Sequence, residues 1–173
     1  VMAAIDAQRE APASLAERLL YAVAAATPEI YTMAAENADL AGMGTTLVVL
    51  LAGEGRISLA YVGDSRAYLV RAGGIRQLTD DHSLVAELLR RHKISEDDAR
   101  EHPHRHVLTR ALGVRPSVEP DLAELTPLPD DVFVLCSDGL TNHLMDQEIA
   151  KIVSTTPDLE AAGKRVESLP SSF

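Results

Sequence analysis

The sequence has little of what several classes of protein require. Its 173 residues include one cysteine, Cys136, so the chain cannot form an internal disulfide and suits a reducing compartment. The longest apolar run is broken at Gly53-Glu54-Gly55-Arg56, short of the roughly 18 residues that a membrane span needs. The N-terminus lacks the basic and then apolar pattern of a signal peptide. We therefore expect a soluble, cytoplasmic protein with no direct membrane contact.

Basic residues are also in the minority. The 16 Lys and Arg against 26 Asp and Glu give a formal net charge of −10. Nucleic-acid phosphates and anionic lipids attract basic surfaces, so this balance argues against both as partners. Hydrophobic residues make up 46%, which is typical of a globular protein and not of a disordered one. We expect one domain over residues 1–173, because a chain of this length can bury roughly 70% of its unfolded surface.

Hydrophobic spacing predicts a long helix followed by strands. Apolar residues recur at intervals of three and four over 13–37, with Ser14 as its cap, and Pro28 is expected to kink or end the first part. The period then changes to β-branched and apolar runs between Gly-containing turns, which predicts strands at 45–52, 57–62, 66–71 and 75–78. Parallel strands need long crossovers, so these four strands are expected to form an antiparallel meander.

The rest of the chain is expected to be mainly helical around one strand. Residues 132–136 are continuously apolar and predict a central strand. The expected helices are 82–92, a short one that begins at Ser95-Glu96-Asp97-Asp98, 146–154 and 159–169. This order of elements is typical of an α+β protein in which helices cover the faces of the sheets.

Acidic residues stand where predicted strands end. Asp138 follows the apolar run 132–136, and the adjacent Gly139 leaves room for a turn or for a ligand. A carboxylate at such a sheet edge suits Mg²⁺ or Mn²⁺, which prefer oxygen ligands. An Asp at this position is equally suited to cap the following helix. The spacing leaves both roles open.

Other polar residues have simpler readings. Gly63-Asp64-Ser65 between two predicted strands is ordinary turn chemistry, and Arg66 at a strand start is expected to pair with a carboxylate. Asp80-Asp81-His82 is expected to cap a helix. His102-Pro103-His104-Arg105-His106 has the alternation of a zinc site, but its proline favours a solvated loop. Cys136 is expected to be a buried apolar side chain and not a nucleophile. No catalytic residue is identified.

Five segments occur in one order between Gly42 and Leu140: Gly42-Met43-Gly44-Thr45-Thr46, Val62-Gly63-Asp64-Ser65-Arg66-Ala67-Tyr68, Leu78-Thr79-Asp80-Asp81-His82-Ser83, Val107-Leu108-Thr109-Arg110-Ala111-Leu112-Gly113 and Leu135-Cys136-Ser137-Asp138-Gly139-Leu140. Together they resemble the metal-dependent Ser/Thr protein phosphatase family (PPM, protein phosphatase type 2C) in its bacterial form. The resemblance implies a four-layer α/β/β/α sandwich of two antiparallel sheets. It also implies a centre of two Mn²⁺ or Mg²⁺ ions, with a third in some bacterial members. A water that the metals activate then hydrolyses phosphoserine or phosphothreonine on proteins.

Residue by residue, the resemblance assigns Asp138 to a core metal and Asp64 to the third metal. The cleft scaffold would comprise 42–46, 79–83, Gly63, Ser65, Arg66 and Gly139, and residues 86–105 resemble the family's mobile flap. The expected partners are a phosphoprotein substrate and a Ser/Thr kinase.

The sequence departs from the family at both ends. It has no Asp-Gly-x-Gly-Gly-His block with its phosphate-binding Arg, and no final Gly-Gly-x-Asp-Asn motif. We therefore expect a fold that is partial at both ends, in a chain that belongs to a longer phosphatase and is inactive alone. The alternative is a non-catalytic phosphatase-like module that binds a phosphoprotein or kinase in bacterial signalling.

Overall fold

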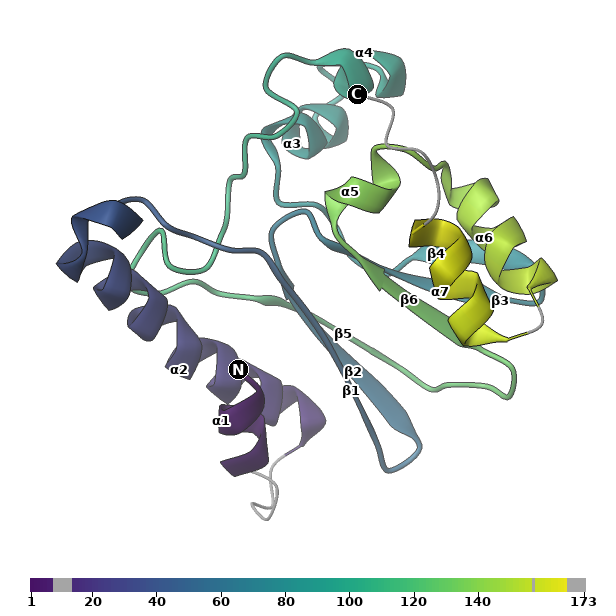
Figure 1. Ribbon diagram of the computed structural model, residues 1–173, viewed down its shortest axis with the longest axis horizontal. Coiled ribbons are helices and arrows are strands. Elements are labelled where there is room, and N and C mark those ends of the chain that lie inside the picture. The colour runs from purple at the N-terminus through teal and green to yellow at the C-terminus, as the bar shows by residue number, and fades with distance from the viewer. Residues whose placement is uncertain (8–13, 157, 168–173) are drawn as a thin grey trace. The chain divides into compact units, whose positions relative to one another are not determined.

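A computed structural model describes residues 1–7, 14–156 and 158–167 of the chain. It contains two three-stranded antiparallel sheets together with helices, which confirms the expected α+β class (Figure 1). The chain divides into two compact units: Val1–Ser65 with Asp80–Pro127, and Arg66–Thr79 with Leu128–Phe173. Each unit holds one sheet. The single domain expected over residues 1–173 stays a prediction.

The sheet of the first unit has the order β1-β2-β5. It consists of β1 (Leu47–Gly53), β2 (Arg56–Val62) and β5 (Asp121–Leu125), all antiparallel. Glu54 and Gly55 join β1 to β2 with φ angles of 53° and 71°, the geometry of the two-residue hairpin turn that matches strand twist. The central strand β2 is buried along almost its whole length.

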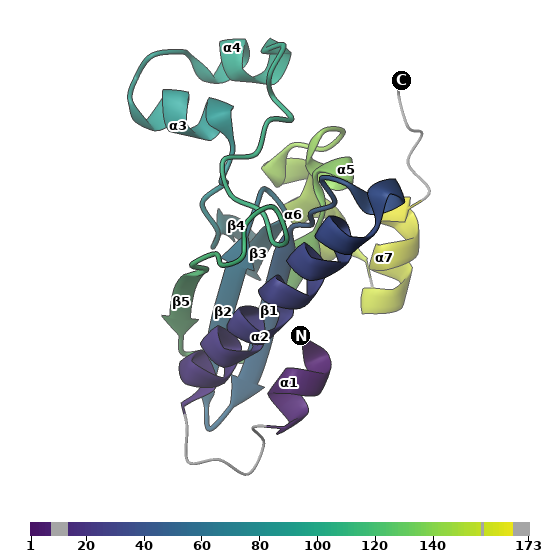
Figure 2. The same cartoon turned by 90° about the vertical axis from the view of Figure 1, so that its left-hand side faces the viewer.

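Helix α2 (Leu15–Glu36) packs on this sheet, and Figure 2 shows it running across β1 and β2. The predicted cap is confirmed, because the Ser14 side chain accepts the Glu17 N–H and the Glu17 carboxylate accepts the Ser14 N–H. The buried face of α2 joins the short helix α1 (Met2–Ala7) and the sheet in a core that includes Ile5, Leu19, Ala22 and Ala60.

The helix does not end at Pro28, contrary to one of the two outcomes expected there. A proline cannot donate a hydrogen bond to the carbonyl four residues earlier, which belongs to Ala24. Both Pro28 and Ala24 are exposed, so water can satisfy that carbonyl. The opposite face of the same turn is anchored by Thr27, which is fully buried and donates its hydroxyl to the Val23 carbonyl (2.8 Å).

Short helices and loops complete the first unit. They are the 3₁₀ turn η1 (Ala38–Leu40), α3 (Leu84–Arg90) and α4 (Glu96–Glu101). The short helix predicted at Ser95-Glu96-Asp97-Asp98 is confirmed as α4, with Ser95 as its cap. The prediction for Asp80-Asp81-His82 is wrong, because Ser83 caps α3 through the Ala86 N–H. The histidine segment 102–106 forms the predicted loop, in which His102 is half-buried and the other four residues are exposed.

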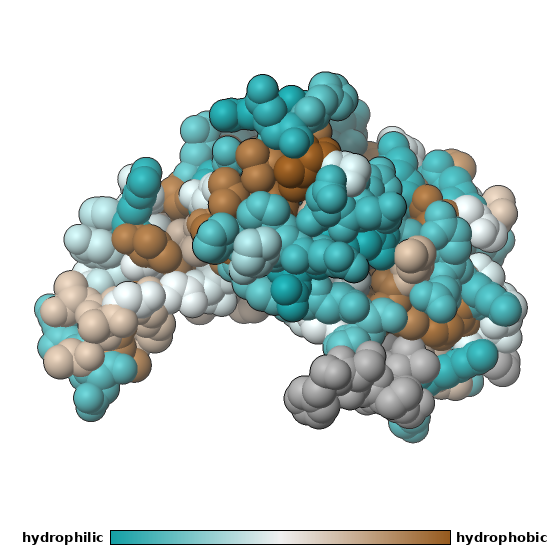
Figure 3. All heavy atoms as spheres, turned by 90° about the horizontal axis from the view of Figure 1, so that it is seen from above, coloured by the Kyte–Doolittle hydropathy of each residue, from teal (hydrophilic) through white to brown (hydrophobic). Residues whose placement is uncertain are grey.

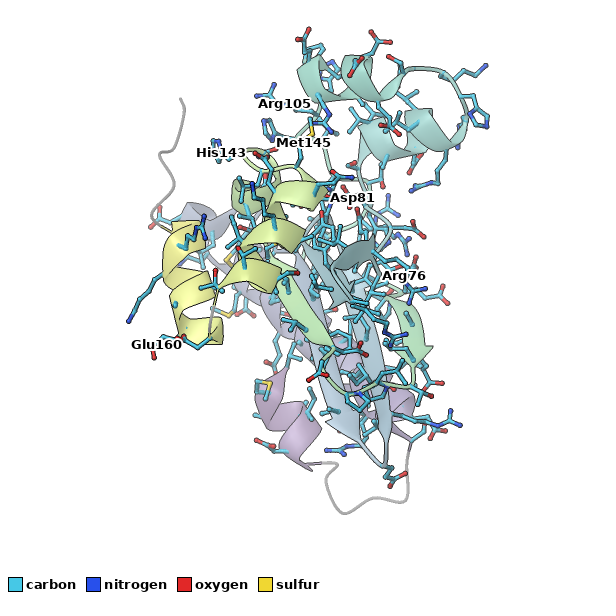
Figure 4. The ribbon with its side chains drawn as sticks, turned by 90° about the vertical axis from the view of Figure 1, so that its right-hand side faces the viewer. Arg76, Asp81, Arg105, His143, Met145 and Glu160 are labelled. Carbon is cyan, nitrogen blue, oxygen red and sulfur yellow. The ribbon has the colours of Figure 1, made fainter. Side chains whose placement is uncertain are left out.

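The sheet of the second unit has the order β4-β3-β6. It consists of β3 (Arg66–Arg71), β4 (Gly74–Gln77) and β6 (Val132–Cys136), again antiparallel. Its helices are α5 (Asp138–Thr141), α6 (Asp146–Thr155) and α7 (Leu159–Glu167). Helix α6 packs on β3, β4 and α7. On α7, Glu160 points outward (Figure 4) and forms an ion pair with Lys164.

The expected four-stranded meander is wrong, because β2 and β3 belong to different sheets. The turns β1–β2 and β3–β4 each have two residues with positive φ, but the segment 63–65 between β2 and β3 has only Gly63. The segment does not form a hairpin, because the strands on either side of it pair in different sheets. Beyond it, β2 pairs with β5, and β3 pairs with β6.

Strand β6 is also less central than expected. Within the described residues it pairs with β3 alone and its side chains are mostly half-buried. Cys136 is accordingly half-buried, not buried as predicted.

Hydrophilic residues cover much of the face seen in Figure 3. Within the described ranges, no helix is both long and apolar enough to cross a membrane.

Candidate functional site

The segment Gly63-Asp64-Ser65 after β2 is held tightly against Thr46. Gly63 has a φ of 103°, and a Cβ added to it would lie 2.4 Å from Thr46 Cγ2. Two residues further on, the hydroxyls of Ser65 and Thr46 share a hydrogen bond of 2.8 Å. Asp64 lies between these two anchors with a half-buried side chain. Its neighbours therefore fix the backbone from which its carboxylate extends.

His82 holds the same segment from the other side. The Gly63 N–H donates to His82 Nδ1 (3.1 Å), and the His82 backbone N–H donates to the Gly63 carbonyl (2.9 Å). The two residues thus form a reciprocal pair of hydrogen bonds, although 19 positions separate them in the chain. Because a peptide N–H can only donate, Nδ1 must be an acceptor, and a neutral imidazole then carries its proton on Nε2.

Two charged residues and one ring surround that imidazole. His82 Nε2 lies 3.3 Å from Asp121 Oδ2, and Arg110 binds both oxygens of Asp121 at 2.6 and 3.2 Å. The Tyr61 ring stacks on His82 with its centroid 5.4 Å away. The His82 side chain is 1% exposed, so these contacts account for both of its ring nitrogens.

The charges of the group follow from these contacts. Burial and the Arg110 charge lower the pKa of His82, against the opposite effect of Asp121. The hydrogen bonds from Arg110 lower the pKa of Asp121. Near neutral pH the site therefore contains a neutral imidazole next to an ionised carboxylate.

Asp138 lies in the second unit, at the start of α5. The helix cap is Ser137, so Asp138 is the first residue of the helix and not its cap. Its half-buried carboxylate accepts a hydrogen bond from Asn142 Nδ2 (3.3 Å). Strand pairing sets Arg66 of β3 opposite Cys136 of β6, two residues before Asp138.

The remaining expected scaffold residues have specific local roles. Arg66 Nη1 donates to the Tyr68 hydroxyl (3.0 Å), and burial raises the pKa of Tyr68 to about 12, which keeps this phenol neutral. Gly139 lies within α5 and has no positive φ, so the turn there does not require glycine.

The donor chemistry of the two aspartates is compatible with a divalent cation. Carboxylate oxygens are the ligands that Mg²⁺ and Mn²⁺ prefer. Across the residues that the structure describes, no group of three or more His, Cys, Asp and Glu is arranged to hold a metal ion. Asp64 and Asp138 each offer a carboxylate with suitable chemistry, and their role as metal ligands stays a prediction.

Sequence reasoning missed the group formed by Tyr61, His82, Arg110 and Asp121. His82 was expected to belong to a helix start. Arg110 lay in one of the five family segments without an assigned role, and Tyr61 and Asp121 lay in none of them. Arg110 and Asp121 follow His82 by 28 and 39 positions in the numbering of the chain. The only local signal was a histidine among residues expected to be polar and exposed, which does not reveal a buried ring.

The structure defines the class of this protein: it is an α+β protein with two antiparallel sheets and with aspartates at strand ends. The family model for Protein phosphatase 2C matches residues 2–167. The chain therefore belongs to the protein phosphatase 2C family.

Curated relatives carry matching names. The chain is 46% identical over 127 residues to the serine/threonine phosphatase stp of Listeria monocytogenes, which covers 73% of this chain and 50% of that protein. It is 40% identical over 123 residues to the protein phosphatase PhpP of Streptococcus pneumoniae, covering 71% of this chain and 49% of that one. The chain thus spans about half the length of the curated relatives it matches.

Solved structures agree with the fold. The serine/threonine phosphatase Stp1 of Staphylococcus aureus matches 95% of this chain and 67% of its own, with a TM-score of 0.85 and 32% identity. PstP/Ppp of Mycobacterium tuberculosis matches 96% and 71%, with a TM-score of 0.86 and 33% identity. A structure of the PstP catalytic domain, at a TM-score of 0.84, 32% identity and 96% and 70% coverage, is a complex with two manganese ions.

Proposed function

We propose that this chain is part of a protein phosphatase that removes phosphate from phosphoserine and phosphothreonine side chains of proteins. The match of the family model to residues 2–167 carries the proposal. The names of the relatives, serine/threonine phosphatase and protein phosphatase, support the substrate class. Phosphorylated proteins, a Ser/Thr kinase among them, are the partners we propose, and the cytoplasm is the location.

Asp64 and Asp138 are the proposed metal ligands on this chain. Both offer half-buried carboxylates at the ends of strands, and neither is the cap of a helix. A bound divalent cation supplies charge neutralisation for a phosphoryl group and lowers the pKa of a coordinated water. We propose Mn²⁺ as the ion, with Mg²⁺ as the alternative, because the PstP catalytic domain was solved with two manganese ions.

The neighbours of the two aspartates have positioning roles in this proposal. Gly63 and Ser65 hold the backbone on either side of Asp64 through Thr46 and His82. Arg66 lies opposite Cys136 in the strand pair that leads to Asp138 and Gly139. Residues 86–105, which contain most of α3 and all of α4, are the proposed flap, at which phosphoproteins are selected.

The test is hydrolysis of a phosphothreonine peptide by this chain in Mn²⁺, with and without a chelator. The test variant is Asp138→Asn, which removes one charge but keeps the shape of the side chain. The matched control is Asp130→Asn in the same unit, because Asp130 is exposed and has a φ of 67° that asparagine also adopts. Circular dichroism checks that both variants fold.

Turnover that the chelator abolishes, that Asp138→Asn loses and that Asp130→Asn keeps supports the proposal. Mn²⁺-dependent binding of the phosphopeptide without turnover, lost in the same variant, supports a non-catalytic phosphatase-like module instead. If the folded chain shows neither turnover nor metal-dependent binding, the metal role of Asp138 on this chain is contradicted. The phosphatase activity is then left to the longer protein, as the expected inactivity of the chain alone implies.

A further inference from the structure

The proposed reaction assigns no role to the buried imidazole of His82 in the first unit. Both of its ring nitrogens have partners: the Gly63 N–H at Nδ1 and Asp121 at Nε2. Gly63 immediately precedes Asp64. A change at His82 can therefore reach Asp64 through the peptide bond between Gly63 and Asp64.

The direction of these hydrogen bonds is fixed by the partners and not by His82. The Gly63 amide has only a proton to offer, so it requires a lone pair on Nδ1. Asp121 is held ionised by Arg110, so it requires a proton from Nε2. The neutral Nε2–H tautomer is the one form of the ring that satisfies both.

Gly63 has little freedom to adapt if this contact is lost. Gly63 has a φ of 103°, and a Cβ added to it would lie 2.4 Å from Thr46 Cγ2. Its backbone is therefore in close contact with Thr46, the residue before β1. Without the Nδ1 acceptor, a buried N–H loses its partner, and the turn must shift to find water. Any such shift moves the Cα of Asp64.

We propose that His82 is a positioning residue for Asp64: Asp121 and Arg110 fix its tautomer, and its Nδ1 holds the Gly63-Asp64-Ser65 segment in the conformation that binds a divalent cation. This inference rests on the proposed metal role of Asp64. It assigns His82, Asp121 and Arg110 to support of a ligand, and gives none of them a contact with the metal or the substrate.

Two isosteric substitutions separate the functions of the two ring nitrogens. In His82→Asn the amide oxygen takes the place of Nδ1, so the acceptor for Gly63 remains and the donor to Asp121 is lost. In His82→Gln the amide nitrogen takes the place of Nε2, so the donor remains and the acceptor is lost. Both variants leave an amide in the same cavity, which makes them matched controls for each other.

Asp121→Asn tests the tautomer without touching the ring. Arg110 donates to Oδ1 of Asp121 at 2.6 Å, so the oxygen of an asparagine is expected to stay with Arg110 and its NH₂ to face His82. Nε2 must then accept, the proton moves to Nδ1, and two N–H groups oppose each other at Gly63. His104→Gln, in the exposed loop, is the control for a histidine-to-amide change.

The measurement is NMR on the full 173-residue chain, titrated with Mn²⁺. Paramagnetic broadening of the Asp64 and Ser65 amide signals reports cation binding at Asp64, and broadening at Asp138 and Gly139 reports the other site. Ring ¹⁵N shifts of His82 report its tautomer. Loss of a supporting partner typically weakens metal binding about 10- to 100-fold.

The expected result is that His82→Gln and Asp121→Asn weaken Mn²⁺ binding at Asp64 by about 10-fold or more and leave broadening at Asp138 unchanged. His82→Asn and His104→Gln should stay close to the unsubstituted chain. If His82→Gln binds at Asp64 as tightly as His82→Asn, or if Nδ1 carries the proton, the positioning role is wrong and the metal role of Asp64 survives. If the unsubstituted chain shows no broadening at Asp64, both are wrong.

Discussion

Gly63→Ala is expected to destabilise the protein strongly, because Gly63 combines an unusual backbone angle with a missing side-chain volume. Its φ of 103° lies outside the range that L-residues readily adopt, which costs about 1–2 kcal/mol. The new Cβ would lie 2.4 Å from Thr46 Cγ2 and 2.7 Å from Thr46 Cβ, and such overpacking adds about 1–3 kcal/mol. The sum, about 2–5 kcal/mol, is a large part of the free energy of unfolding of a typical domain, which is about 5–15 kcal/mol.

Gly55→Ala is the matched control. Gly55 has a φ of 71° in the β1–β2 turn and nothing within 4 Å of its hypothetical Cβ. It therefore carries the backbone cost of about 1–2 kcal/mol without the overlap. Urea unfolding followed by circular dichroism gives both free energies of unfolding, provided that the denaturant dependence stays the same.

A double substitution isolates the contact with Thr46. Thr46→Ser removes Cγ2 but keeps the hydroxyl that bonds to Ser65. Combined with Gly63→Ala it should cost less than the sum of the two single changes. Equal costs for Gly63→Ala and Gly55→Ala, or strict additivity in the double variant, would refute the idea that Thr46 fixes this turn.

Three further predictions concern other parts of the chain. Pro28→Ala should stabilise the protein by up to about 3 kcal/mol in urea unfolding, because it restores a helical hydrogen bond on the exposed side of α2; a loss of stability would contradict this. Leu59→Ala, at a side chain with 0% exposure, should cost about 2–5 kcal/mol, whereas Leu128→Ala at 52% exposure should change stability by less than about 0.5 kcal/mol. Stability should fall as the pH drops below the ordinary histidine pKa of 6.5, because burial and Arg110 lower the folded-state pKa of His82 and the unfolded chain then binds more protons. His82→Asn should reduce that slope in urea titrations on both sides of this pH, and an unchanged slope would assign it to other groups.

Local signals predicted much of the secondary structure. Two-residue turns with glycine form the β1–β2 and β3–β4 hairpins. The bounds predicted for β3, Arg66–Arg71, are the observed ones. Ser14 and Ser95 begin their helices as expected, each with a reciprocal cap. These features depend on residues within four positions of one another. The order of the predicted elements indicated the α+β class, and the resemblance of five short segments to a family supplied the arrangement in two sheets.

Long-range pairing was beyond the same reasoning. The apolar run of β6 does not indicate that β6 is an edge strand of its described sheet. The position of β6 depends on which strands pair with β3. Similarly, the segment 63–65 reads as a hairpin turn until β5 is known to occupy the other side of β2. Pro28 fails as a helix end for a comparable reason. The proline lies on the exposed face of α2, where water can satisfy the Ala24 carbonyl, and burial of the opposite face holds the helix together.

The candidate metal ligands illustrate the same limit at the level of single side chains. Taken alone, Gly63-Asp64-Ser65 is a turn, and nothing in three residues separates a solvated aspartate from a positioned one. What positions Asp64 comes from Thr46 before β1, from His82 after β4, and from Arg110 and Asp121 near β5. A sequence that keeps the three-residue segment but has no hydrogen-bond acceptor at position 82 would keep the carboxylate and lose its orientation. A ligand role can therefore be transferred from a relative to Asp64 only when the relative has equivalent residues at these distant positions.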